Sequence, residues 1–154
     1  MQYTVRFAHL VKVPSLKVGN TVKRGDIVGI MGSSGQSTAP HVHIDVVEGK
    51  RAERYTLNDI ELNKPKAAPP RQLLYFVDVE LFGVEPVVTT YYADPDYFVE
   101  YHKVHFGFDV VPFDRHSTQD HFNIKWPRSM VGKVVAVDYD ANGYGHCISI
   151  SYEV

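Results

Sequence analysis

Residues Lys133-Val134-Val135-Ala136-Val137 and Ile148-Ser149-Ile150-Ser151 lie on either side of the turn sequence Asp140-Ala141-Asn142-Gly143. The first run is rich in β-branched residues, and the last alternates apolar with polar side chains, as a half-buried strand does. Asn-Gly is a strong signal for a tight turn between antiparallel strands. These residues therefore predict a β-hairpin in the C-terminal part of the chain.

Glycine and proline divide the rest of the chain into short segments of the same kind. Residues 18–22 and 23–28 each predict a short strand beside a glycine turn. Residues 55–62 have room for one or two helical turns, but no stretch has the pattern of a long amphipathic helix. We expect an all-β or nearly all-β fold, built as an antiparallel sheet or β-sandwich.

The composition changes twice along the chain. Residues 50–70 are charged and then rich in proline and alanine, which is typical of a linker. β character resumes in residues 71–154, beginning with Leu73–Val79. We expect one domain, residues 1–154, in which the linker joins residues 1–49 to residues 71–154.

The overall composition excludes several classes of protein. The chain has 154 residues, of which 44% are hydrophobic and 22% are charged, and a net charge of −2. This suits one globular domain without a membrane span, and it argues against binding to nucleic acid through phosphates. Cys147 is the single cysteine, which excludes an internal disulfide. The first residues lack the apolar stretch of a signal peptide, so we expect another export route or a piece of a larger protein.

The first candidate site is His41-Val42-His43, followed by the strand-like Ile44 and Asp45. Residues i and i+2 of a strand point to the same face, so His41, His43 and Asp45 project together. The two imidazoles could bind a metal, or one could bind while the other moves protons. Asp45 could orient an imidazole or form a surface ion pair. The alternative for the two histidines is a position on the surface of a strand.

The second candidate site is His105-Phe106-Gly107-Phe108-Asp109. As a strand, it places His105, Gly107 and Asp109 on one face, with Gly107 leaving space between the two polar side chains. Taken alone, the pair could be a simple surface hydrogen bond. Together with His-x-His it supplies three candidate ligands and leaves one position open, which is the pattern of a catalytic zinc rather than a structural one.

These motifs resemble those of the lysostaphin/LytM-type zinc metallopeptidases, family M23, which cut peptide bonds in bacterial peptidoglycan. The resemblance covers about two-thirds of the chain and rests on these stretches: Phe7-Ala8-His9-Leu10, Val18–Gly29, Gly32–Val46, His105–Asp109, Gly132–Val137 and Asn142-Gly143-Tyr144-Gly145.

The resemblance implies a role for each of five residues. His43, His105 and Asp109 would be the zinc ligands. His9 and His41 would be the catalytic histidines that orient water, assist proton transfer and stabilise the oxyanion. All five positions are filled, which favours an active enzyme over a degenerate relative.

The order of the motifs differs from that of the family, in which His-x-x-x-Asp precedes His-x-His. The chain therefore resembles a circular permutant, with residues 50–104 joining the ends of the family domain and with new ends in a hairpin, where cuts are tolerated. This predicts that Met1 and Val154 lie close together on adjacent antiparallel strands. A monomer that closes its own site is favoured, and a domain-swapped oligomer is the alternative.

The aromatic residues upstream of His105 and the remaining histidines allow two interpretations. Aromatic side chains between Tyr91 and Tyr101 could pack in the core or form the wall of a substrate groove. Cys147 is expected to be buried and without a catalytic role. We expect surface or loop positions for the other histidines, which are His102, His116, His121 and His146.

The leading functional hypothesis is a zinc endopeptidase that hydrolyses cross-bridge or stem peptides of peptidoglycan. It would act at the cell wall, as an extracellular or virion-associated protein, with a phage origin as one source. The alternative is a non-catalytic cell-wall-binding or phage-tail module that keeps the fold. A biotinyl or lipoyl carrier is disfavoured, because Met31 precedes Gly32 and not a lysine.

Overall fold

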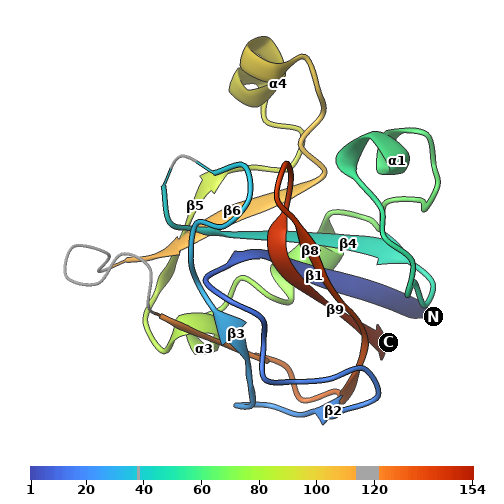
Figure 1. Cartoon of the computed structure of the whole chain (residues 1–154), viewed down its shortest axis with the longest axis vertical. Coiled ribbons are helices and arrows are strands. Elements are labelled where there is room, and N and C mark those ends of the chain that lie inside the picture. Colours follow the sequence, from blue (N-terminus) through green and yellow to red (C-terminus); the bar gives the residue numbers. More distant parts are fainter. Residues whose placement is uncertain (38, 114–121) are drawn as a thin grey trace.

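The computed structural model describes residues 1–37, 39–113 and 122–154, and it is mostly β (Figure 1). One sheet has seven strands in the order β2-β8-β9-β1-β4-β6-β5, and every neighbouring pair is antiparallel. A second sheet pairs β3 with β7. The predicted fold class is confirmed. The strands are β1 (Gln2–Leu10), β2 (Thr21–Val22), β3 (Ile27–Ile30), β4 (Val42–Glu48), β5 (Pro86–Thr90), β6 (Gly107–Pro112), β7 (Asn123–Lys125), β8 (Gly132–Asp140) and β9 (Gly145–Glu153).

Alternation along the central strands gives the large sheet two different faces. In β4, Ile44 and Val46 belong to the hydrophobic core, whereas His43 and Asp45 lie on the opposite face, as predicted. The core face is covered by β3, β7 and the two short helices within residues 71–82. Trp126 is fully buried there. The sheet therefore presents its polar residues on the face away from the main core, and the site is built there.

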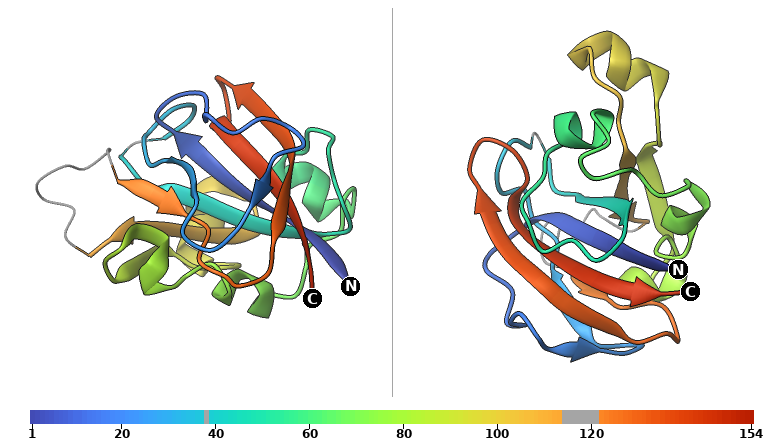
Figure 2. Two further views of the ribbon diagram at one scale, coloured as in Figure 1. Left: turned by 90° about the horizontal axis from the view of Figure 1, so that it is seen from below. Right: turned by 90° about the vertical axis from the view of Figure 1, so that its right-hand side faces the viewer.

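The predicted hairpin is β8–β9, in which Val134 pairs with Ile150 and Val137 with Ile148. β9 then pairs with β1 in the antiparallel sense. The ammonium group of Met1 donates to the backbone oxygen of Val154 over 2.7 Å. The predicted proximity of the two ends is confirmed, and all three views have them side by side (Figures 1 and 2).

In residues 1–37, 39–113 and 122–154, four short helices interrupt the β structure: α1 (Leu57–Glu61), α2 (Arg71–Leu74), α3 (Val79–Phe82) and α4 (Pro95–Tyr101). α1 lies within the predicted helical turns. The prediction of β character for residues 73–79 is wrong. Pro70, with a helical φ of −55°, starts α2, and the side chain of Asp78 caps the N-terminus of α3. In the described part of the chain, no helix is long and apolar enough to span a membrane.

Residues 50–70 do more than link two halves. Tyr55 and Ile60 pack with Val47 in a small second core on the polar face of the sheet. α4 stands out from the sheet, and its described side chains include none that is buried (Figure 2). Core packing is therefore the wrong interpretation for the aromatic side chains of α4, because this helix has no opposing layer.

Candidate functional site

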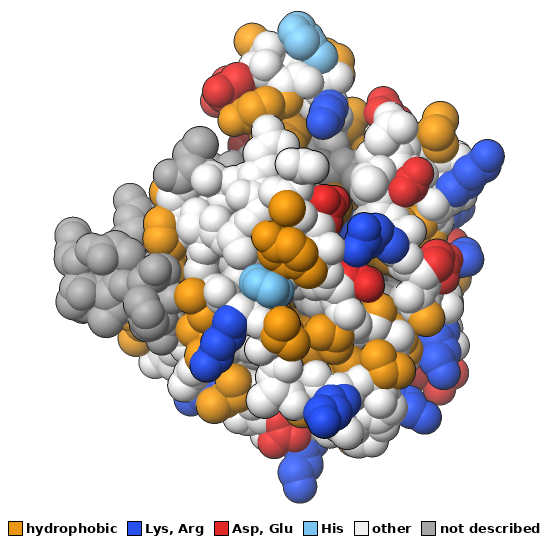
Figure 3. All heavy atoms as spheres, viewed as in Figure 1, with side chains coloured by type: hydrophobic (Ala, Val, Ile, Leu, Met, Phe, Trp, Pro, Cys, Tyr) orange, Lys and Arg blue, Asp and Glu red, His pale blue; other side chains and the backbone are white. Residues whose placement is uncertain are grey.

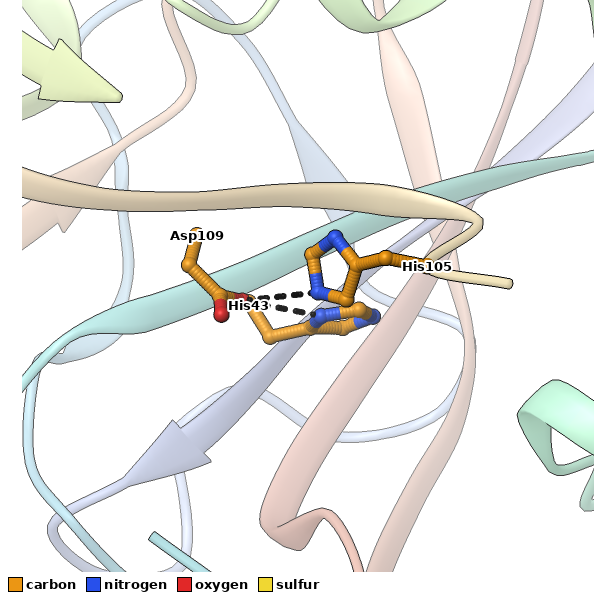
Figure 4. A group of neighbouring side chains, drawn as sticks. All are labelled: His43, His105 and Asp109. Atoms are coloured by element: carbon orange, nitrogen blue, oxygen red, sulfur yellow. Dashed lines mark hydrogen bonds and ion pairs between the residues drawn. The ribbon is translucent and has the colours of Figure 1, made fainter. Parts of the chain in front are cut away.

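Strand pairing brings together the two predicted motifs, which are far apart in the sequence. In the β4–β6 pair, His43 lies directly opposite Asp109, and Asp45 lies opposite Gly107. His105 lies just before β6 and points back toward the same place. His43 Nδ1 is 3.1 Å from Asp109 Oδ1, and His105 Nε2 is 3.3 Å from the same oxygen (Figure 4).

The donor set fits a zinc ion. One ligand atom from each of His43, His105 and Asp109 lies within 4.8 Å of the others, and both imidazoles are buried. Two imidazole nitrogens and one carboxylate oxygen are ligands that zinc accepts. The remaining nitrogen of each ring is also held, His43 Nε2 by Asp45 Oδ2 at 2.8 Å and His105 Nδ1 by the Tyr91 carbonyl at 3.2 Å. With those outer nitrogens carrying hydrogen, the inner nitrogens have free lone pairs for a metal.

Gly107 provides space for His43 on the neighbouring strand, a role that its position between His105 and Asp109 did not predict. A Cβ at residue 107 would lie 2.3 Å from the Ile44 carbonyl oxygen and 3.0 Å from His43 Cε1. The first distance is far below van der Waals contact, and the second is tight. A side chain here would push β6 away from β4 and displace the imidazole.

His9 and His41 lie next to the three candidate ligands. The rings of His9 and His41 are 4.8 Å apart, and His41 Nε2 is 3.7 Å from Asp109 Oδ1. His9 has a φ of +62° at an irregularity in the β1–β9 pairing, which turns this residue out of the regular strand alternation. His9 Nδ1 lies 2.8 Å from the Ser34 carbonyl and His41 Nδ1 lies 2.8 Å from the Ala39 carbonyl. Each ring therefore keeps Nε2 available to the site.

Burial and hydrogen bonds at the site shift the pKa values of His43, Asp109 and His9. Burial alone would lower the pKa of His43, but hydrogen bonds to Asp109 and Asp45 outweigh it and raise the pKa to about 9. Burial opposes ionisation of Asp109, yet the hydrogen bonds from His105 and His43 hold its pKa well below the usual range. Burial lowers the pKa of His9 to about 4, so that this ring is neutral at pH 7. In the metal-free protein, a proton on His43 thus occupies part of the space that a cation would fill.

The site opens into a groove of about 1370 Å³. One side of the groove comes from α4 and the other from the α1 region and the β8–β9 turn, and in Figure 3 a notch separates the α4 region from the α1 region. Tyr97 lines the groove and stacks on His105 with the ring centroids 4.6 Å apart, while Tyr101 lies beside it at 4.7 Å. These contacts agree with the groove-wall interpretation for Tyr97 and Tyr101, whereas Tyr92 packs against the hydrophobic core.

The remaining predicted residues lie away from the ligands. His102 is exposed at the end of α4, as expected, whereas His146 lies half-buried within strand β9 against Tyr139 and so is not in a loop. Cys147 is buried, which raises the pKa of its thiol to about 11 and leaves it unreactive, as expected. His116 and His121 lie outside the described residues.

Three residues outside the predicted site, Arg6, Tyr55 and Tyr144, form a cluster next to Asp45. Arg6 pairs with Asp45 behind His43, and the rings of Tyr55 and Tyr144 lie on either side of the Arg6 guanidinium. A signal existed for Arg6, because a charged residue inside a mostly apolar strand is rarely buried unless it is paired. Tyr55 lies in the segment interpreted as a linker, so nothing in the sequence pointed to it.

Comparison with known proteins finds matches over part of the chain. Residues 1–54 match peptidase family M23. A peptidoglycan DD-endopeptidase, ShyA of Vibrio cholerae, is 31% identical over 77 residues, which are 49% of this chain and 17% of that protein. An uncharacterized metalloprotease of Buchnera aphidicola is 41% identical over 44 residues, 29% of this chain and 11% of that protein. The chain thus aligns with less than a fifth of either relative. No solved structure gives a significant match. The similarity to peptidase family M23 thus lies in residues 1–54, which include His9, His41 and His43.

Proposed function

We propose that this chain is a zinc-dependent endopeptidase that hydrolyses peptide bonds in bacterial peptidoglycan. One observation carries the proposal: three donors of the type zinc accepts, from His43, His105 and Asp109, converge at the floor of a groove beside two further histidines. The match of residues 1–54 to peptidase family M23 and the similarity to a peptidoglycan DD-endopeptidase support the substrate class.

In this proposal, His43, His105 and Asp109 hold the zinc ion. When bound, zinc lowers the pKa of water toward neutrality and polarises a carbonyl oxygen. Asp45 and the Tyr91 carbonyl fix the two imidazoles so that their ligating nitrogens face inward. Burial of both rings limits competition from bulk water at the ligands.

The two other histidines divide the proton chemistry. His41 accepts a proton at Nε2 from the attacking water and returns it to the nitrogen of the leaving amine as the C–N bond breaks. Its Nδ1 stays hydrogen-bonded to the Ala39 carbonyl throughout, which keeps the ring in place. His9 remains neutral, since burial lowers its pKa to about 4, and its Nε2 accepts a hydrogen bond that orients the water.

We further propose that residues 1–154 form one circularly permuted peptidase domain that works as a monomer. The adjacency of Met1 and Val154 on β1 and β9 supports the permutation, and the supply of all five site residues by one chain supports the monomer. A peptidoglycan substrate would place its site of action at the cell wall, outside the cell or on a virion.

The test compares zinc content and turnover in four variants. His43→Ala and Asp109→Ala should lose both the zinc and the release of peptides from purified peptidoglycan. His41→Ala should retain one zinc per chain and lose at least about 100-fold in rate, the usual contribution of a general base. His102→Asn, at an exposed histidine outside the groove, is the control and should change neither.

Two results would contradict the proposal. A His41→Ala protein that cleaves at the wild-type rate would refute the assignment of the base. Wild-type protein that holds one zinc per chain and cleaves no peptidoglycan would favour the non-catalytic cell-wall-binding module instead.

A further inference from the structure

A buried ion pair lies directly behind His43, on the side away from the groove. Arg6 donates to Asp45 Oδ2 from Nη2 at 2.6 Å and from Nε at 3.2 Å. The same oxygen accepts from His43 Nε2 at 2.8 Å. The side chains of Arg6 and Asp45 are only 4% and 0% exposed. The pair thus forms a continuous hydrogen-bonded path to one of the three candidate ligands.

Strand register fixes this arrangement. Arg6 lies directly opposite Asp45 in the β1–β4 pair, and Ala8 lies opposite His43. The small side chain of Ala8 leaves room for the imidazole, and the carboxylate approaches it from the next position on the same face. A 180° rotation of the His43 ring would put a carbon atom against Asp45 Oδ2 and lose the hydrogen bond. The geometry therefore favours one ring orientation, with Nδ1 toward Asp109.

Aromatic rings enclose the pair. The Arg6 guanidinium carbon is 3.8 Å from the Tyr144 ring centroid and 4.0 Å from the Tyr55 ring centroid. Arg6 Nη1 also donates to the Tyr55 carbonyl oxygen. Tyr55 is buried and belongs to the segment that connects the His-x-His half to the His-x-x-x-Asp half. The connecting segment thus contacts the back of the site as well as joining its two motifs.

We propose that Arg6 and Asp45 are positioning residues that hold His43 with Nδ1 toward the metal site, and that Tyr55 keeps this pair enclosed. This inference rests on the proposed function only for the identity of the metal. Arg6 is needed because a buried carboxylate without a cation is strongly unfavourable. Tyr55 is needed because water at Arg6 would weaken both the ion pair and the hydrogen bond to His43.

Zinc affinity, measured by competition with a chromophoric chelator, tests the proposal. Loss of an outer hydrogen-bond partner typically weakens metal binding about 10- to 100-fold. The loss of zinc affinity in Asp45→Ala should therefore lie in this range. The loss in Asp45→Asn should be smaller, because asparagine keeps an acceptor oxygen. Tyr55→Ala should weaken binding, whereas Tyr55→Phe should not, because the Tyr55 hydroxyl has no hydrogen-bond partner among the described residues.

A matched control separates positioning from general destabilisation. Thr4→Val removes a buried hydroxyl on β1 that donates to the Gly49 carbonyl and accepts from Arg51, remote from His43. It should lower the stability of the metal-free protein in urea without changing zinc affinity. Long-range ¹H–¹⁵N spectra of the zinc-loaded protein with ¹⁵N-labelled histidine give a second readout. They should identify Nδ1 as the ligating nitrogen of His43 in the wild type and a mixture of ring orientations in Asp45→Ala.

The outcomes are distinguishable. Wild-type zinc affinity in Asp45→Ala, or an equal loss in Thr4→Val, would overturn the positioning role while leaving the proposed function intact. Unchanged affinity in Tyr55→Ala would overturn the role of the connecting segment. A wild-type protein that binds no zinc would refute the proposed function, and this inference with it.

Discussion

Replacing Gly107 with alanine tests whether the spacing of β4 and β6 controls the site. The added Cβ would lie 2.3 Å from the Ile44 carbonyl oxygen and 3.0 Å from His43 Cε1. The carbonyl belongs to a strand paired on both sides, so it has little freedom to move. Relief requires β4 and β6 to separate locally by about 1 Å, which also carries His43 away from its register partner, Asp109.

Both stability and metal binding should respond. Overpacking of this kind costs about 1–3 kcal/mol in the free energy of unfolding. Because the imidazole must shift by a few tenths of an ångström as well, we expect zinc affinity to fall about tenfold or more. Urea unfolding of the metal-free protein gives the first quantity, and competition with a chelator gives the second.

Gly25→Ala provides the matched control. Gly25 has a φ of +90° and nothing within 4 Å of an added Cβ, so alanine costs about 1 kcal/mol through backbone strain alone. It should lower stability and leave zinc affinity unchanged. The reasoning is refuted if Gly107→Ala binds zinc as the wild type does, or if both variants lose affinity in proportion to stability.

Three further predictions follow from the charges and the topology. Arg6→Met leaves the buried Asp45 carboxylate without its cation and should lower the free energy of unfolding of the metal-free protein in urea by about 3–5 kcal/mol. Combining Arg6→Met with Asp45→Asn should lower it less, because no unpaired buried charge is left. The pKa of His43 is raised to about 9 in the metal-free protein, so zinc must displace the proton of His43 at pH 7. Zinc affinity, measured at constant ionic strength, should therefore rise about tenfold per pH unit from pH 7 to 9 and level off above pH 9. In a rearranged chain that starts at residue 84, an Asn-Gly linker joins Val154 to Met1, and the chain ends at residue 83. Because Met1 and Val154 are adjacent, this chain should keep the zinc affinity of the original at every protein concentration. A zinc affinity that falls on dilution would indicate a domain-swapped site.

The sequence predicted the parts of the fold that depend on local pattern. Alternation in Val42–Glu48 correctly placed His43 and Asp45 on one face, and the turn before Gly143 correctly located the β8–β9 hairpin. The same reasoning failed for residues 73–79. A short apolar run with β-branched residues fits a strand or a helix equally well, and here a proline and a capping aspartate start two helices.

The site was predictable where it depends on motifs, and not where it depends on tertiary contacts. His43, His105 and Asp109 carry the motif spacing, and the structure brings them together. The burial of Arg6 depends on a partner 39 residues away in the sequence. Tyr55 contacts Arg6 because residues 50–70 fold back onto the sheet. No hydrophobic periodicity in that segment predicts its path.

The most direct test of the central claim is digestion of purified peptidoglycan with zinc-loaded and chelator-treated protein, followed by mass spectrometry of the products. The account predicts new peptide amino termini only with the zinc-loaded protein, and their masses would identify the bond that is cut. The same products after chelation, or none from any wall type with protein that holds one zinc per chain, would contradict a zinc-dependent peptidoglycan endopeptidase.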